Sequence, residues 1–258
     1  MGERKAPEGT QAIVRAIGLL KGLSQRHPAR TLAELCSDSG LSKSTAHRLL
    51  AALESESLVA RDPNGRYHLG AAVIALGARA FLSNDLRLMV QPALESLAAE
   101  SAETATLEVL SDKQMLIIGE VSSPHLVCAT PEIGTRWPLH ATSTGKALLA
   151  ALPRARVRDL LEFPLKRLTV ATITDPSELS RELEIIRERG YASAMEELEV
   201  GAAAVGAVLH DPLGDVVGAI SIGGPVSRMS IEKLASVGET LCRMARELSQ
   251  RYDAIVET

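Results

Sequence analysis

The chain has 258 residues, of which 46% are apolar and 23% charged, a composition typical of a globular protein with one or two domains. Its apolar runs are too short for a membrane span and no signal-peptide pattern follows the charged N-terminus, so we expect a cytoplasmic protein without a membrane partner. The three cysteines and six histidines are scattered, which argues against a disulfide framework and against a metal site.

The net charge of −4 is unevenly distributed along the chain. Residues 1–70 carry a net charge of +3, whereas residues 71–258 carry −7. A mildly basic segment before an acidic body predicts two parts with different partners. Aromatic residues are scarce, which disfavours binding of single-stranded nucleic acid by base stacking but leaves recognition of a duplex open.

The first segment has the start and stop signals of three helices. Apolar residues at helical spacing predict a first helix from about residue 13 to residue 23. Thr31 and Glu34 form a capping box, which begins a short second helix. Gly40 suits a tight turn, and Ser42 is the expected N-cap of a third helix that runs to about Glu56.

The third helix is predicted to have one buried and one recognition face. Ala46, Leu49, Leu50 and Leu53 recur at helical spacing and form the expected buried stripe. The opposite face is small or hydrogen-bonding, so it can lie in a groove of duplex DNA, as in a helix-turn-helix. The side chains expected to contact DNA from this helix are Lys43, Ser44, Thr45, His47 and Arg48.

A β-hairpin is expected next, because two short strand-like runs flank a strong turn signal at residues 62–65. The hairpin would serve as a wing, with Arg61, Arg66 and His68 available to contact phosphates. The alternative for residues 11–69 is a small helical bundle with a hairpin and no role on DNA.

Residues 71–83 are apolar on most sides, so this predicted helix must be covered by other protein. We expect it to link the two domains and to pack in a dimer, with residues 1–70 as the DNA-binding domain and residues 84–258 as the second domain. Helices are expected near residues 86–100, 145–152, 176–189 and 230–251, and hairpins near residues 104–121 and 201–222, with a possible strand at 126–130. This arrangement predicts an α+β domain with an antiparallel sheet.

The second domain contains no motif of catalysis or cofactor binding. Residues 142–146 suggest a phosphate-binding loop, but His140 stands where the motif needs glycine and Ala147 where it needs Ser or Thr. His140 and Ser143 suggest a hydrolytic pair, but the nucleophile-elbow pattern is absent from the sequence. We therefore predict no catalytic residue, no cofactor and no enzyme activity.

The sequence resembles the IclR family of bacterial transcriptional regulators in the order and spacing of six motif segments. The resemblance covers nearly the whole chain. These segments are residues 31–35, 40–50, 65–70, 138–149, 196–201 and 221–225. The resemblance implies a winged helix-turn-helix dimer joined to an effector-binding domain with a GAF-like sheet, often assembled as a tetramer.

The resemblance also implies positions for an effector pocket. These are Ser143, Thr144, Glu196, Ala204, Ser221 and Gly223. Their hydroxyls suit a small organic effector such as a carboxylate or an aromatic acid. Some members have a polar side chain in place of Gly223 and a cysteine in place of Ala204, and this departure favours a larger or more apolar effector.

The sequence therefore predicts a ligand-responsive repressor that binds a near-palindromic operator. A dimer would meet two half-sites about one helical turn, ~34 Å, apart. Two alternatives stay open: a ligand-sensing module that acts mainly through protein–protein contacts, and an enzyme with an accessory helix-turn-helix domain.

Overall fold

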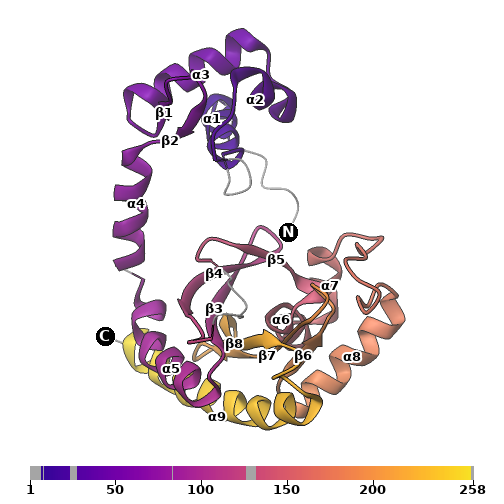
Figure 1. The fold of residues 1–258 in the computed structure, drawn as a ribbon. Coiled ribbons are helices and arrows are strands. Elements are labelled where there is room, and N and C mark those ends of the chain that lie inside the picture. Colours follow the sequence, from indigo (N-terminus) through magenta and orange to yellow (C-terminus); the bar gives the residue numbers. More distant parts are fainter. Residues whose placement is uncertain (1–6, 8, 24–27, 83, 126–131, 257–258) are drawn as a thin grey trace. The chain divides into compact units, whose positions relative to one another are not determined.

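The chain folds into two units, Met1–Ser83 and Asn84–Thr258, in the computed structural model (Figure 1). The structure describes residues 7, 9–23, 28–82, 84–125 and 132–256. Within these ranges, no helix combines the length and the apolar character that crossing a lipid bilayer requires. The strand expected at residues 126–130 lies outside the described residues.

Three helices begin the first unit, and two of them start at the predicted caps. They are α1 (Gln11–Lys21), α2 (Leu32–Ser39) and α3 (Lys43–Ser55). Thr31 accepts a hydrogen bond from the amide of Glu34, whose carboxylate accepts the Thr31 amide at 2.7 Å. Gly40 ends α2 in the left-handed conformation with φ of 65°, and Ser42 caps α3 by accepting the Thr45 amide at 3.3 Å. The helix-turn-helix predicted from these signals is confirmed.

The core of this unit lies between the helices and the wing. Ala46, Leu50 and Leu53 are buried on α3, as predicted, whereas Leu49 is half-buried. The wing is an antiparallel pair of strands, β1 (Val59–Arg61) and β2 (Tyr67–Leu69). Its turn closes with a hydrogen bond of 2.9 Å from the Gly65 amide to the Asp62 carbonyl.

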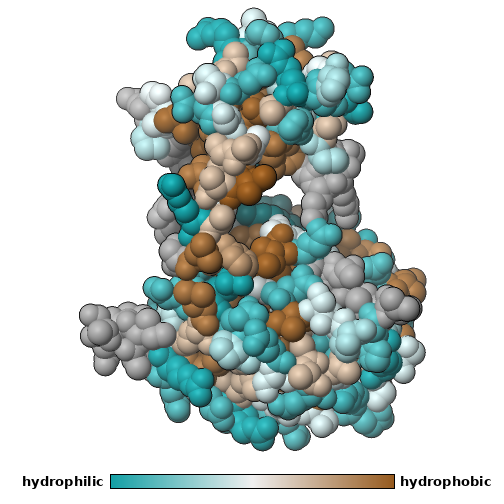
Figure 2. Space-filling model, turned by 60° about the vertical axis from the view of Figure 1, so that its left-hand side comes forward, coloured by the Kyte–Doolittle hydropathy of each residue, from teal (hydrophilic) through white to brown (hydrophobic). Residues whose placement is uncertain are grey.

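Helix α4 (Ala71–Leu82) leaves most of its apolar surface uncovered in the single chain. Ile74 is 75% exposed, and Leu76 and Leu82 are also exposed. Figure 2 shows apolar side chains gathered along this helix. A continuous apolar surface of this kind marks an interaction site in soluble proteins.

The second unit is built on a six-stranded antiparallel sheet of order β5-β4-β3-β8-β7-β6. Its strands are β3 (Thr104–Ser111), β4 (Gln114–Val121), β5 (Arg136–Pro138), β6 (Ala192–Met195), β7 (Ala202–His210) and β8 (Val216–Pro225). The two predicted hairpins are present, and β3 lies against β8, which brings the two hairpins together at the centre of the sheet.

Helices cover both faces of this sheet (Figure 1). They are α5 (Asp85–Ser101) and α9 (Ile231–Val256) on one face, and α6 (Ser143–Ala151), α7 (Arg154–Leu160) and α8 (Pro176–Arg189) on the other side, with the short 3-10 helix η1 (Leu139–Ala141) before α6. Leu107, Val205 and Ile220 point toward α5 and α9 and form the main core. The α+β class expected from the sequence is confirmed.

Candidate DNA-binding face and effector cavity

The side of α3 opposite its buried stripe is open to solvent. Lys43, Ser44, His47 and Arg48 are exposed, and Thr45 is half-buried. The side chains of Lys43 and Arg48 have no hydrogen bond or ion pair with another described residue. The helix therefore presents two free cations on the face predicted to read DNA.

Hydroxyl groups cluster at the start of this face. The Oγ of Ser42 lies 3.1 Å from the Oγ of Ser44 and 2.9 Å from the Oγ1 of Thr45. Because these hydroxyls bond to one another at the N-terminus of α3, they are held in place beside free helix amides. Such a helix start is suited to binding an anionic phosphate oxygen.

The two arginines of the wing differ in their surroundings. Arg66 is exposed, and its guanidinium has no hydrogen bond to another described residue. Arg61 instead forms two hydrogen bonds with the carboxylate of Glu54, of 3.0 and 2.7 Å, and lies 5.4 Å from the centre of the Tyr67 ring. Of the two arginines expected at phosphates, the structure leaves only Arg66 uncommitted.

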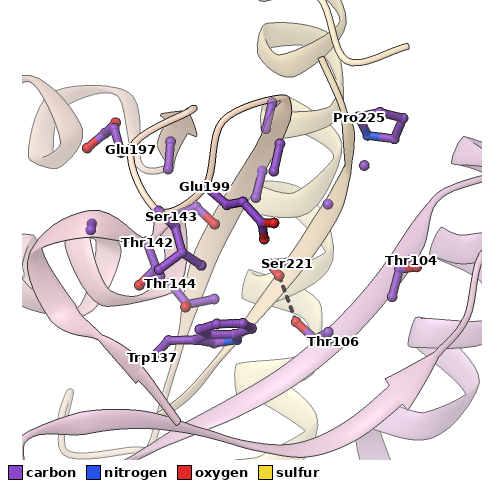
Figure 3. Close-up of a pocket in the computed structure, with 18 of the residues that line it drawn as sticks. Thr104, Thr106, Trp137, Thr142, Ser143, Thr144, Glu197, Glu199, Ser221 and Pro225 are labelled. Carbon is purple, nitrogen blue, oxygen red and sulfur yellow. Dashed lines mark hydrogen bonds between the residues drawn. The ribbon is translucent and has the colours of Figure 1, made fainter. Parts of the chain in front are cut away.

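A cavity of about 370 Å³ lies over the α6 side of the sheet in the second unit (Figure 3). It is bounded by β3, β7 and β8, by the first turn of α6 and by the loop that leads into β7. Its lining includes the polar or bulky side chains Thr104, Thr106, Glu108, Trp137, Thr142, Ser143, Thr144, Glu197, Glu199 and Ser221. Its volume falls in the range of small-molecule sites.

Small residues form the floor of the cavity. Ala204 of β7, Gly223 of β8 and Thr104 of β3 are neighbours across the sheet. Gly206 lies in the next row, where an added Cβ would stand 3.1 Å from both the Ser143 Oγ and the Thr144 amide nitrogen. The absence of a side chain at this glycine lets the first turn of α6 approach the sheet and brings its hydroxyls to the cavity.

Five of the six predicted pocket residues line this cavity, namely Ser143, Thr144, Ala204, Ser221 and Gly223. Glu196, the sixth, is not among the residues that line it. Its backbone has a φ of 55°, and its carboxylate accepts the Gly201 amide at 2.7 Å, which ties the side chain to its own loop. The adjacent Glu197 lines the cavity instead.

Glu108 is the principal residue that the sequence analysis missed. Its side chain is buried, with the residue only 3% exposed, and it borders the cavity. Thr144 donates a hydrogen bond of 2.7 Å to one carboxyl oxygen, and Thr106 one of 3.0 Å to the other. The hydroxyl of Thr106 also lies 2.7 Å from that of Ser221. Burial raises the pKa of Glu108 to about 7, and the hydroxyl hydrogen bonds oppose this rise.

Lys146 is buried beside the cavity and paired. Its Nζ lies 2.5 Å from a carboxylate oxygen of Glu197 and 3.5 Å from one of Glu182. Burial raises the pKa of Glu197, and the charge of Lys146 lowers it in part. The lysine that suggested a phosphate-binding loop is thus held in an ion pair.

A winged helix-turn-helix unit followed by a sheet unit with a ligand-sized cavity defines a ligand-responsive, DNA-binding transcriptional regulator. The IclR helix-turn-helix domain model matches residues 12–63, and the model of the C-terminal domain of the bacterial transcriptional regulator IclR matches residues 78–250. The chain belongs to the IclR family of bacterial transcriptional regulators.

Known relatives cover almost the full chain. The transcriptional repressor IclR of Escherichia coli K12 is 33% identical over 246 residues, which are 94% of this chain and 90% of that protein. A solved transcriptional regulator from Alicyclobacillus acidocaldarius has a TM-score of 0.84 at 30% identity, covering 93% of this chain and 98% of its own. An IclR homologue from Microbacterium hydrocarbonoxydans, solved with 4-hydroxybenzoate, has a TM-score of 0.79 at 25% identity, covering 93% and 99%. The names of the family and of these relatives are those of regulators rather than of enzymes.

Proposed function

We propose that this protein is a cytoplasmic repressor whose helix α3 binds the major groove of an operator. The observation that carries the proposal is the open face of α3, with the free cations Lys43 and Arg48 opposite the buried leucines. In this arrangement Arg48, Ser44 and Thr45 contact base edges, and Lys43 contacts a backbone phosphate.

The remaining residues predicted to contact DNA contribute to binding to different degrees. His47 flanks the recognition face, and Arg66 holds a phosphate from the wing. Arg61 contributes less charge to DNA than Arg66 does, because Glu54 neutralises it. Repression is supported by the names of relatives such as the E. coli repressor.

The functional form is a homo-oligomer, a dimer or a tetramer, that meets a near-palindromic operator. The exposed apolar side chains of α4 support association, since a single chain leaves them in water. Two recognition helices then bind half-sites about one helical turn apart.

A small organic effector occupies the cavity and changes the affinity for DNA. The cavity has the size of a ligand site, and five of the pocket positions implied by the family resemblance meet in it. Effector binding shifts the protein between arrangements only by its differential affinity for them, typically about 1–3 kcal/mol per coupled site.

The groove assignment is tested by titrating the DNA upstream of the protein's own gene with wild type, Arg48→Ala and the control Arg156→Ala. Arg156 is an exposed arginine on α7 in the second unit. We expect Arg48→Ala to weaken specific binding by roughly ten- to a hundredfold, since a base-edge arginine contributes about 1–3 kcal/mol. The control should bind as wild type does.

Equal affinity of Arg48→Ala and wild type for the specific site would refute the groove assignment. Wild-type protein that binds no specific site would favour the sensing module or the enzyme with an accessory domain.

The cavity assignment is tested separately by Ser221→Ala, which should alter the response to an effector found by thermal-shift screening while DNA binding without effector persists.

A further inference from the structure

Three carboxyl groups line the cavity, and only that of Glu197 is paired with a basic side chain, Lys146, which is not itself part of the lining. They belong to Glu108, Glu197 and Glu199. Among the described residues that line the cavity there is no lysine, arginine or histidine. A site for a carboxylate usually supplies arginine or lysine, so this lining differs from the one expected for an acidic effector.

Glu108 has only neutral partners. Its two oxygens accept hydrogen bonds from the hydroxyls of Thr144 and Thr106. A carboxylate oxygen can accept more than one hydrogen bond, so each oxygen retains capacity for a donor from the cavity. Buried charge is costly unless it is paired, and a ligand cation would provide the missing pair.

The charged groups on the neighbouring elements are engaged elsewhere. Lys146 of α6 is bound by Glu197 and Glu182. Glu120 of β4, which pairs with Thr106 across the strands, accepts the hydroxyl of Ser122 at 2.7 Å. On β8 the Ser221 hydroxyl lies 2.7 Å from that of Thr106, which donates to Glu108, and its hydrogen bonding lowers the pKa of Glu108.

The other two carboxylates also have unused acceptor capacity. The second carboxylate oxygen of Glu197 is buried and has no hydrogen-bond partner among the described residues. Glu199 is exposed at the cavity, and Figure 3 shows its carboxylate pointing inward in the direction of Ser221. The carboxylate of Glu199 has no hydrogen bond or ion pair with another described residue.

An aromatic ring completes the lining. The indole of Trp137 borders the same cavity, below Ser221 and Thr144 in the view of Figure 3. An aromatic face attracts an ammonium group, and indole does so best among the side chains. Carboxylates and an aromatic ring around one cavity form an environment for a cation.

We propose that the effector of this regulator is a small primary amine, whose ammonium group enters the cavity and pairs with Glu108. This inference rests on the proposed function only in taking the cavity as the effector site. A carboxylate effector would bring a fourth acidic group beside Glu108, Glu197 and Glu199. The first turn of α6, which attracts anions, already faces the Glu108 carboxyl through Thr144.

The pairing makes amine binding depend on pH. An ammonium group pairs with the ionised form of Glu108, which is depleted below a pKa of about 7. Between pH 8 and pH 6 the ionised fraction falls from about nine tenths to about one tenth, so amine affinity should fall roughly tenfold. A carboxylate that binds the protonated form of Glu108 would show the opposite trend.

The test compares probes that differ only in their charged group. Benzylamine, phenethylamine and cadaverine are matched with phenylacetate, hydrocinnamate and pimelate, and each is added to the full-length protein in thermal-shift assays at pH 6 and pH 8. Amines should raise the melting temperature more than their matched acids, and more at pH 8 than at pH 6. Calorimetric titration of the most effective amine gives its Kd at both pH values.

Two variants locate the effect. Glu108→Gln keeps the shape and removes the charge, so it should weaken amine binding at pH 8 by about tenfold or more and abolish its pH dependence. The matched control Glu188→Gln, which removes an exposed carboxylate of α8 outside the cavity lining, should change Kd by no more than about threefold and keep the pH dependence, because a distant exposed charge contributes little. If Glu108→Gln does not fold, the proposal is still tested by the wild type, through its preference for amines over the matched acids and through the pH dependence of amine binding.

The proposal is overturned if no amine stabilises the wild type, if the acids stabilise it more, or if Glu108→Gln binds amines as the wild type does. DNA titrations of the same samples distinguish these results from failure of the proposed function. If the acids stabilise the protein and alter its affinity for DNA, the protein is still a ligand-responsive regulator, but its effector is an acid rather than an amine.

Discussion

The carboxylate of Glu54, on the last turn of α3, holds the guanidinium of Arg61 on β1 through two hydrogen bonds of 3.0 and 2.7 Å. This contact lowers the pKa of Glu54 and raises that of Arg61. The pair joins the recognition helix to the wing, so the wing is positioned by the same residue that neutralises one of its two arginines.

Glu54→Gln should strengthen the binding of DNA of any sequence, because it releases the charge of Arg61. Each added phosphate contact releases about one further counterion, so the slope of log K against log salt should become steeper by up to about one. Fluorescence anisotropy at several salt concentrations measures this slope. Arg66→Ala is the matched comparison and should make the slope shallower by about one. An unchanged slope in Glu54→Gln would show that Arg61 does not reach DNA.

Glu108 should make the stability of the protein depend on pH. Its folded pKa of about 7 lies above the ordinary value of 4.5, so the folded state binds more protons than the unfolded state between these values. The free energy of unfolding contributed by this group is therefore greatest below pH 4.5, declines as pH rises to 7 and is then constant. The expected loss is roughly 3 kcal/mol.

Urea unfolding at pH 5 and pH 8 for wild type and Glu108→Gln measures this contribution. The glutamine variant should lose less stability over this interval, by about the amount assigned to Glu108. Glu197 also has a raised pKa and titrates in the same direction, but it is present in both proteins and cancels in the comparison. Parallel pH profiles would contradict the assignment.

The parts of the fold that sequence could predict are those with local causes. The capping box of Thr31 and Glu34 and the N-cap at Ser42 depend on residues three positions apart or fewer, and both are present as predicted. The hairpins follow from alternation of apolar residues around turns. Strand β5 and helix α7 were missed because each is short, and β5 is defined mainly by its pairing with β4.

The site was predicted less completely because its chemistry depends on tertiary contacts. Glu108 alternates with Thr106 and Thr104 along β3, a pattern that a solvent-facing strand also shows. In the folded chain, α6 packs on that face and Thr144 bonds to the carboxyl group, which is buried. The positive φ of Glu196 and the bond of its carboxylate to the Gly201 amide are features of the folded loop, so the sequence could not show that Glu197 rather than Glu196 lines the cavity.

The folded protein should be strongly destabilised when one partner of the buried pair of Lys146 and Glu197 is removed. Lys146 is 1% exposed, and its Nζ lies 2.5 Å from Glu197. Lys146→Met would remove the cation that pairs with the buried carboxylate of Glu197, at a cost of about 3–5 kcal/mol. Urea unfolding at pH 8 measures the loss.

The double variant Lys146→Met/Glu197→Gln serves as the control for this pair. It removes both charges, so its loss should be smaller than the sum of the two single losses. Additive losses would show that the two side chains do not interact in solution.

Helix α4 should carry the association of subunits. Ile74 is 75% exposed on it, and a glutamate there would place a charge in any apolar interface. Ile74→Glu should therefore shift the mass measured by light scattering toward the single chain, and it should weaken operator binding because one chain meets only one half-site. Val170→Glu is the control, since Val170 is 93% exposed and lies outside the helices and strands of the second unit. If both variants keep the wild-type mass, subunits associate through a surface other than α4.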